Sequence, residues 1–91
     1  MIPKKIKILG HEYKVTLDDD YITESGGNTG RCNSYTNEIH ICGKLQESAQ
    51  HEVLMHEIIE ALNYRLELDL EHYKICALGE VLTQVLLDND L

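Results

Sequence analysis

The sequence contains no phenylalanine, no tryptophan and only one proline among its 91 residues. Without those two aromatic residues, a buried core must consist of aliphatic side chains and some of the five tyrosines. Basic residues are also scarce, because 8 Lys and Arg stand against 16 Asp and Glu and give a formal net charge of -8. This balance argues against a nucleic-acid surface, which needs clustered Lys and Arg, and against adsorption on anionic lipid.

Long apolar runs and paired cysteines are absent as well. No stretch reaches the ~18 apolar residues that predict a transmembrane helix. No apolar run of about 7–15 residues follows Lys4 and Lys5, so we expect no signal peptide. Cys32, Cys42 and Cys76 are odd in number and form no Cys-x-x-Cys pair. We therefore expect no disulfide framework and a reduced, cytoplasmic setting.

The length of the chain predicts one domain, residues 1–91, with one modest core. Its predicted regions are a sheet over residues 1–44, a helix over 46–66 and a second helix over 70–88. The sequence therefore predicts an α+β fold, in which an N-terminal antiparallel sheet of about four strands, arranged as two hairpins, packs on two C-terminal helices.

Alternating polar and apolar residues predict the two hairpins. Residues 4–9 and 12–17 alternate on either side of a Gly-His turn, which is typical of a first hairpin. Residues 31–35 and 38–42 predict a second hairpin, in which Ile39 and Ile41 face the core. The Gly-rich segment between the hairpins, residues 21–30, is expected to be a loop.

The two predicted helices carry apolar residues at helical spacing. In the first helix these are Ala49, Val53, Ile58, Ala61, Leu62 and Leu66. In the second helix the expected buried stripe is Ile75, Leu78, Leu82, Val85 and Leu86. Because the connector between them is short, we expect the helices to be antiparallel or steeply crossed.

The first helix contains His-Glu-Ile-Ile-Glu at residues 56–60, one residue away from His-Glu-x-x-His, the zinc-helix motif of metallopeptidases. Residues i and i+4 lie on one helix face, one turn apart, so both can reach one metal ion. The glutamate that follows the first histidine stays unligated and can act as a general base toward a metal-bound water. This spacing predicts His56 and Glu60 as ligands and Glu57 as the catalytic base.

A third ligand is expected from the start of the second helix, where His72 would approach Glu60. The predicted site is then His56, Glu60 and His72 around one divalent ion, with a fourth position open to water. Glu71 and Glu80 are alternatives to His72. Because a carboxylate is harder than an imidazole, Mn²⁺ or Fe²⁺ is an alternative to zinc.

Each of these residues also has an ordinary structural interpretation. A single helical histidine is more often a hydrogen-bonded core residue, and Glu60 would otherwise pair with Arg65 or Lys74. The combination favours the metal, because burying two nearby carboxylates without a cation or a donor is costly.

Four segments carry a resemblance to a known family: Gly-Arg-Cys at 30–32, Glu-Ile-His-Ile at 38–41, the helix motif at 54–63 and residues 82–89. They are similar to small metallopeptidase-like proteins encoded by phages and prophages. The distance from Glu60 to His72 also resembles that of SprT-like metalloproteases. The resemblance implies a minimal zincin fold that binds zinc through His56 and His72, with Glu57 as base. It further implies that an extended peptide, as substrate or partner, pairs along strand 38–41.

We therefore predict a zincin-like protein that binds a divalent metal, zinc above all, and hydrolyses peptide or amide bonds with a metal-activated water. The alternative is a non-catalytic acidic interaction or regulatory protein on the same scaffold, for which the net charge of -8 is the motivation.

Overall fold

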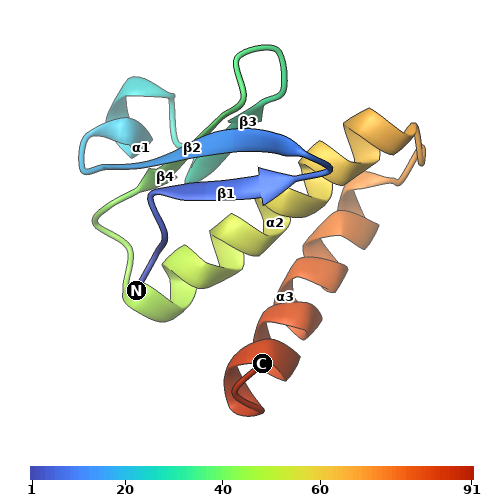
Figure 1. Ribbon diagram of the computed structural model, residues 1–91. Helices are drawn as coiled ribbons and strands as arrows, with labels where there is room; N and C mark the ends of the chain where they lie inside the picture. Colours follow the sequence, from blue (N-terminus) through green and yellow to red (C-terminus); the bar gives the residue numbers. More distant parts are fainter.

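Four strands and three helices follow one another along the chain in the computed structural model, which describes residues 1–91 (Figure 1). The elements are β1 (Lys5–Ile8), β2 (His11–Asp18), α1 (Tyr21–Glu24), β3 (Gly30–Asn33), β4 (Glu38–Cys42), α2 (Glu47–Leu66) and α3 (His72–Asp88). The predicted α+β fold, a four-stranded N-terminal sheet followed by two C-terminal helices, is confirmed. None of the helices combines the length and the apolar character needed to cross a bilayer.

The sheet is mixed, whereas an antiparallel sheet was expected. Its strand order is β1-β2-β4-β3, with β1–β2 and β3–β4 antiparallel and β2–β4 parallel. Both predicted hairpins are present, but β4 rather than β3 lies beside β2, where Val15 pairs with Ile39 and Leu17 with Ile41. This order puts the fully buried Ile39 and Ile41 on an interior strand and leaves β1 and β3 as the two edges.

One helical turn, α1, replaces part of the loop expected over residues 21–30. The amides of Thr23 and Glu24 donate to the carbonyl of Asp20 over 3.1 and 3.0 Å. Tyr21 is buried, and its ring stacks on His40 of β4 with the ring centroids 5.8 Å apart. This aromatic contact holds the turn against the sheet.

Helix α2 lies between the sheet and α3 and contacts β1, β3 and β4 on one side and α3 on the other (Figure 1). The core forms where α2 covers the sheet. Its buried members are Ile2, Ile8, Tyr13, Val15, Ile39, Ile41, Leu54 and Ala61. Because α2 is central, residues on opposite sides of this one helix face either the sheet or α3.

Helix α3 buries only part of the predicted stripe, because Ile75 is buried and Leu86 is half-buried. Ile75, Gly79 and Thr83 are its buried residues, whereas the expected core residues Leu78 and Val85, like Leu82, are exposed. The small residue Gly79 meets the backbone of α2, so the helices approach closely along this line. Apolar periodicity identified a helix here, but three of the five predicted core residues, Leu78, Leu82 and Val85, are exposed.

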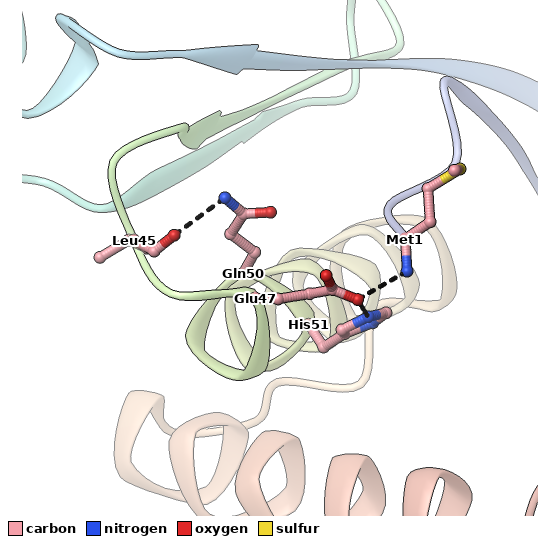
Figure 2. A network of polar contacts seen from close by, with 5 residues as sticks. All are labelled: Met1, Leu45, Glu47, Gln50 and His51. Atoms are coloured by element: carbon pink, nitrogen blue, oxygen red, sulfur yellow. Dashed lines mark hydrogen bonds and ion pairs between the residues drawn. The ribbon is translucent and has the colours of Figure 1, made fainter.

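The N-terminal end of α2 is tied to the segments around it (Figure 2). The side-chain amide of Gln50 donates to the carbonyls of Leu45 at 3.0 Å and Gly43 at 3.2 Å. The carboxylate of Glu47 pairs with the amino group of Met1 at 2.8 Å and lies 3.6 Å from Nε2 of His51 (Figure 2). The ammonium group beside Glu47 lowers the pKa of its carboxyl. These contacts fix the first turn of α2 against the segment that follows β4 and against the N-terminus of the chain.

The C-terminal end of α2 is held by one arginine. Arg65 donates to the hydroxyl of Tyr13 over 2.7 Å and to the side chain of Asn37 over 2.6 Å. A third bond reaches the carbonyl of Ser34 over 3.2 Å. Since Tyr13 is fully buried on β2, this network joins α2 to both hairpins and leaves the helix little freedom to rotate.

Candidate metal centre

The motif residues occupy the middle of α2. His56 and Glu60 lie one turn apart, with Nε2 of His56 3.9 Å from Oε2 of Glu60. Both side chains are partly exposed. The structure therefore places the two predicted α2 ligands on one helix face, as the i, i+4 spacing requires.

Helix α3 brings His72 against this face. The rings of His56 and His72 meet edge to face, with their centroids 5.3 Å apart and an interplanar angle of 66°. His72 is exposed, so a ligand can reach the pair from solvent. The second helix was expected to bring His72 toward Glu60, in one site with His56, and the structure brings it against His56.

Cys76 also belongs to this group, and the sequence reasoning missed it. Its Sγ lies 3.4 Å from Nε2 of His72, one helical turn earlier. One donor atom from each of His56, His72 and Cys76 lies within 4.8 Å of the others. The signal in the sequence is the His-x-x-x-Cys spacing of residues 72–76, the same i, i+4 relation that drew attention to residues 56 and 60.

The donor set fits a small divalent ion. Tetrahedral zinc with bonds of ~2.0–2.3 Å to nitrogen and sulfur separates two ligand atoms by ~3.3–3.6 Å. The sulfur–nitrogen distance of 3.4 Å falls in this range, and the group as a whole, within 4.8 Å, must contract slightly. Two imidazoles and one thiolate are soft to borderline donors that select zinc over Mg²⁺ or Ca²⁺.

Three predicted or alternative ligands lie outside the three-residue group. Glu60 is 3.9 Å from His56 but is not within reach of all three donors. Glu71 pairs with Lys74 at 3.6 Å. Glu80 is exposed and is no member of the group. Glu60 is thus the one carboxylate beside the cluster, and the structure gives no support for Glu71 or Glu80 as the third ligand.

The electrostatics of the cluster favour a neutral imidazole. Burial lowers the pKa of His56, the Glu60 carboxylate beside it raises that pKa, and the nearby His72 lowers it again, with a net downward shift. A neutral ring nitrogen has a free lone pair, which is the form that binds a metal. His56 is therefore ready to act as a ligand near neutral pH.

Glu57 is the one charged residue of the chain that is buried. It is only 7% exposed. Burial, followed by the repulsion of the nearby Glu60 carboxylate, raises the pKa of Glu57 to about 7. A carboxyl group with this pKa exchanges protons near neutral pH, which is what general acid–base chemistry requires.

Glu57 faces the sheet, whereas His72 and Cys76 lie on the α3 side of α2. A Cβ added to Gly30 of β3 would lie 3.2 Å from Oε2 of Glu57 and would collide with Cγ1 of Val53. Only glycine at position 30 lets β3 pass this closely over α2. The proposed base thus lies under the edge strand, on the sheet side of α2, whereas His72 and Cys76 lie on its α3 side.

A cavity of about 440 Å³ opens between β3 and the C-terminal half of α2. It is lined by Arg31, Cys32, Asn33, Ser34, Tyr35, Glu60, Asn63 and Tyr64. Glu60 therefore has the group of His56, His72 and Cys76 on one side and this cavity on the other. Strand β4 is paired on both edges, so residues 38–41 have no open edge for the extended peptide expected there, and the free edge beside the cavity belongs to β3.

Comparison with known proteins finds no family model that matches the chain, and no significant match among curated proteins or solved structures. The zincin-like interpretation consequently depends on the motif in the sequence and on the geometry of α2 and α3.

Proposed function

We propose that the protein is a divalent-metal-binding hydrolase of the zincin type, with zinc as its metal and a peptide or amide as its substrate. The observation that carries the proposal is the convergence of His56, His72 and Cys76, whose donor atoms lie within 4.8 Å of one another. Three side chains from two helices meet there, and the fourth side of the group is accessible to solvent.

The roles of the chain's own residues follow from their positions. His56 and His72 hold the ion, with Cys76 or Glu60 as the third ligand. A zinc ion in this place supplies a Lewis acid and a bound water whose pKa lies near ~7. Glu57, with a pKa of about 7, takes up and releases the proton. Arg31 lines the adjoining cavity and supplies a positive charge toward a substrate carbonyl or carboxylate.

The substrate site that goes with this proposal is the cavity beside β3. An extended peptide pairs with the open edge of β3, so its backbone runs past Glu60 toward the metal cluster. This arrangement replaces pairing along residues 38–41, because both edges of β4 are already hydrogen-bonded to neighbouring strands.

Zinc titration of the chelator-treated protein tests the proposal. We expect one Zn²⁺ per chain and a raised melting temperature. His72→Ala should weaken zinc binding more than ~100-fold, because even residues that only orient a ligand contribute ~10–100-fold. His11→Ala, which removes an exposed histidine on β2, is the matched control and should bind normally. Absence of zinc binding by the unmodified protein would overturn the proposal.

Hydrolysis needs a separate readout. Glu57→Gln should bind zinc as well as the unmodified protein but lose cleavage of a fluorogenic peptide library.

The second candidate function is a non-catalytic acidic interaction protein, for which the net charge of -8 and the position of Glu57 under the sheet are the supporting observations. Binding of zinc without cleavage of any peptide or amide by the unmodified protein would favour that second function.

A further inference from the structure

The side of α3 that faces away from α2 carries an apolar stripe. Its members are Leu78, Val81, Leu82 and Val85, which are 43%, 58%, 40% and 37% exposed. They recur at i, i+3, i+4 and i+7, which puts them on one face of the helix. The buried residues Ile75, Gly79 and Thr83 lie on another face, against α2. Figure 1 shows α3 at the outside of the molecule, with α2 as its neighbour.

Two charges flank this α3 stripe. Lys74 lies one turn before Leu78, and Asp88 lies three residues after Val85. At 100° per residue, both are within about 20° of the direction of Val81. Lys74 and Asp88 are each seven residues from Val81, on opposite sides of it. The face therefore carries Lys74, which pairs with Glu71 of its own chain at 3.6 Å, at one end, apolar residues in the middle and Asp88 at the other end, with Val81 at its centre.

We propose that the α3 stripe joins two copies of this chain, with their α3 helices antiparallel about a two-fold axis that passes beside Val81. In this arrangement Lys74 of each copy faces the partner's Asp88, and Leu78 packs near the partner's Val85. A two-fold interface requires that one patch be complementary to itself, and the order of charge and apolar residues along α3 meets this condition. A parallel arrangement would place like charges together and is disfavoured.

The interface is independent of the proposed metal centre. His72 and Cys76 lie with His56 on the side of α3 that meets α2. The α3 stripe is on a different face, so two chains can associate with or without metal. Loss of dimerisation and loss of zinc binding are consequently separable results.

Sedimentation equilibrium of the full chain in chelator measures the association. We expect a particle of twice the 10.4 kDa chain mass, with dissociation at low concentration. Val81→Glu places two carboxylates beside the axis and should weaken the dimer at least ~10-fold. Leu17→Glu is the matched control, because Leu17 is 47% exposed but lies on β2 and not on α3, and it should leave the dimer unchanged.

A charge exchange tests the antiparallel register. Lys74→Asp and Asp88→Lys should each weaken the dimer about 3–10-fold, since each creates two like-charge contacts. The double variant Lys74→Asp/Asp88→Lys should restore the affinity of the unmodified chain. A chain that stays monomeric up to about 1 mM overturns the proposal, as does a dimer that is insensitive to Val81→Glu or a double exchange that fails to restore association.

Discussion

Gly79 of α3 lies directly against the backbone of His56 of α2: a Cβ added to Gly79 would be 3.5 Å from both the Cα and the N of His56. This is a close contact between the two helices that carry His56, His72 and Cys76. His72 lies about two turns before Gly79 on α3, so the separation of the helices here decides whether its ring reaches His56.

Substitutions of Gly79 should separate the effect of helix packing on stability from the effect of helix propensity. Gly79→Ala places its methyl group at ordinary contact distance and should stabilise the protein by up to ~1 kcal/mol, because alanine favours helix over glycine. Gly79→Leu should cost ~1–3 kcal/mol by forcing the helices apart, and should weaken zinc binding at least ~10-fold through displacement of His72. Thermal unfolding and zinc titration measure the two effects. Equal zinc affinity in both variants would contradict this account of the contact.

The third ligand is testable by replacing zinc with Co²⁺. If Cys76 is a ligand, the Co²⁺ complex should show thiolate-to-metal charge transfer in the near ultraviolet. Cys76→Ser should abolish this absorption, whereas Glu60→Gln should retain it. The opposite pattern, normal Co²⁺ binding without a thiolate band and loss of binding in Glu60→Gln, would instead support the ligand set predicted from the motif.

The burial of Glu57 should make stability depend on pH. Its pKa is raised from 4.5 to about 7 in the folded protein. Between these values the folded state binds more protons than the unfolded state, so the free energy of unfolding falls as pH rises, by about 3 kcal/mol in total. Below pH ~4.5 the carboxyl is protonated in both states, and the burial penalty is absent.

Urea unfolding of metal-free protein at several values from pH 4 to pH 8 would measure this dependence. Glu57→Gln should remove the fall, so the variant should exceed the unmodified protein in stability at pH 8 and match it most closely at acid pH. The lowered pKa of His56 acts in the opposite direction, because its folded state resists protonation. Both proteins share that effect, so it cancels in the difference. If the stability of the unmodified protein and that of Glu57→Gln depended equally on pH, the raised pKa would not belong to Glu57.

Asn63 should act as a positioning residue for α3. Its side-chain oxygen accepts the backbone N–H of Leu70 at 2.9 Å, across a connector in which Glu67 and Asp69 have φ values of 50° and 54°. Asn63→Ala should cost ~1–2 kcal/mol by leaving that donor unpaired. It should also weaken zinc binding, because His72 follows shortly after. Asn63→Asp keeps the acceptor and should preserve both properties in thermal melts and zinc titrations.

Gly30 is the position where β3 crosses α2 most closely. Gly30→Ala should cost ~1–3 kcal/mol, because the added methyl group collides with Val53. Gly79→Ala, whose new methyl group would be 3.5 Å from the backbone of His56, is the matched control. Chemical denaturation gives the difference, and a neutral Gly30→Ala would show that the strand can shift away from the helix.

Local pattern was enough to identify the four strands, the two long helices and one face of the site, but not the short helix α1. The alternation around Ile39 and Ile41 indicated a buried strand, and the structure buries both residues completely. The i, i+4 spacing of His56 and Glu60 necessarily puts them one turn apart on a helix. Periodicity depends on neighbours within a few residues, so it can be read from the chain without knowing how the elements pack.

Three features depended on contacts between distant segments. Strand β4 lies beside β2, which makes the sheet mixed and leaves β3 as the open edge. Cys76 joins His56 and His72 because α3 approaches α2 along Gly79. Leu78 and Val85 stay exposed because the line formed by Ile75, Gly79 and Thr83 is the one that is buried against α2. Several packings of these elements are compatible with the same local sequence patterns. Which packing forms depends on which surfaces fit together at close range, and this fit cannot be read from any single segment.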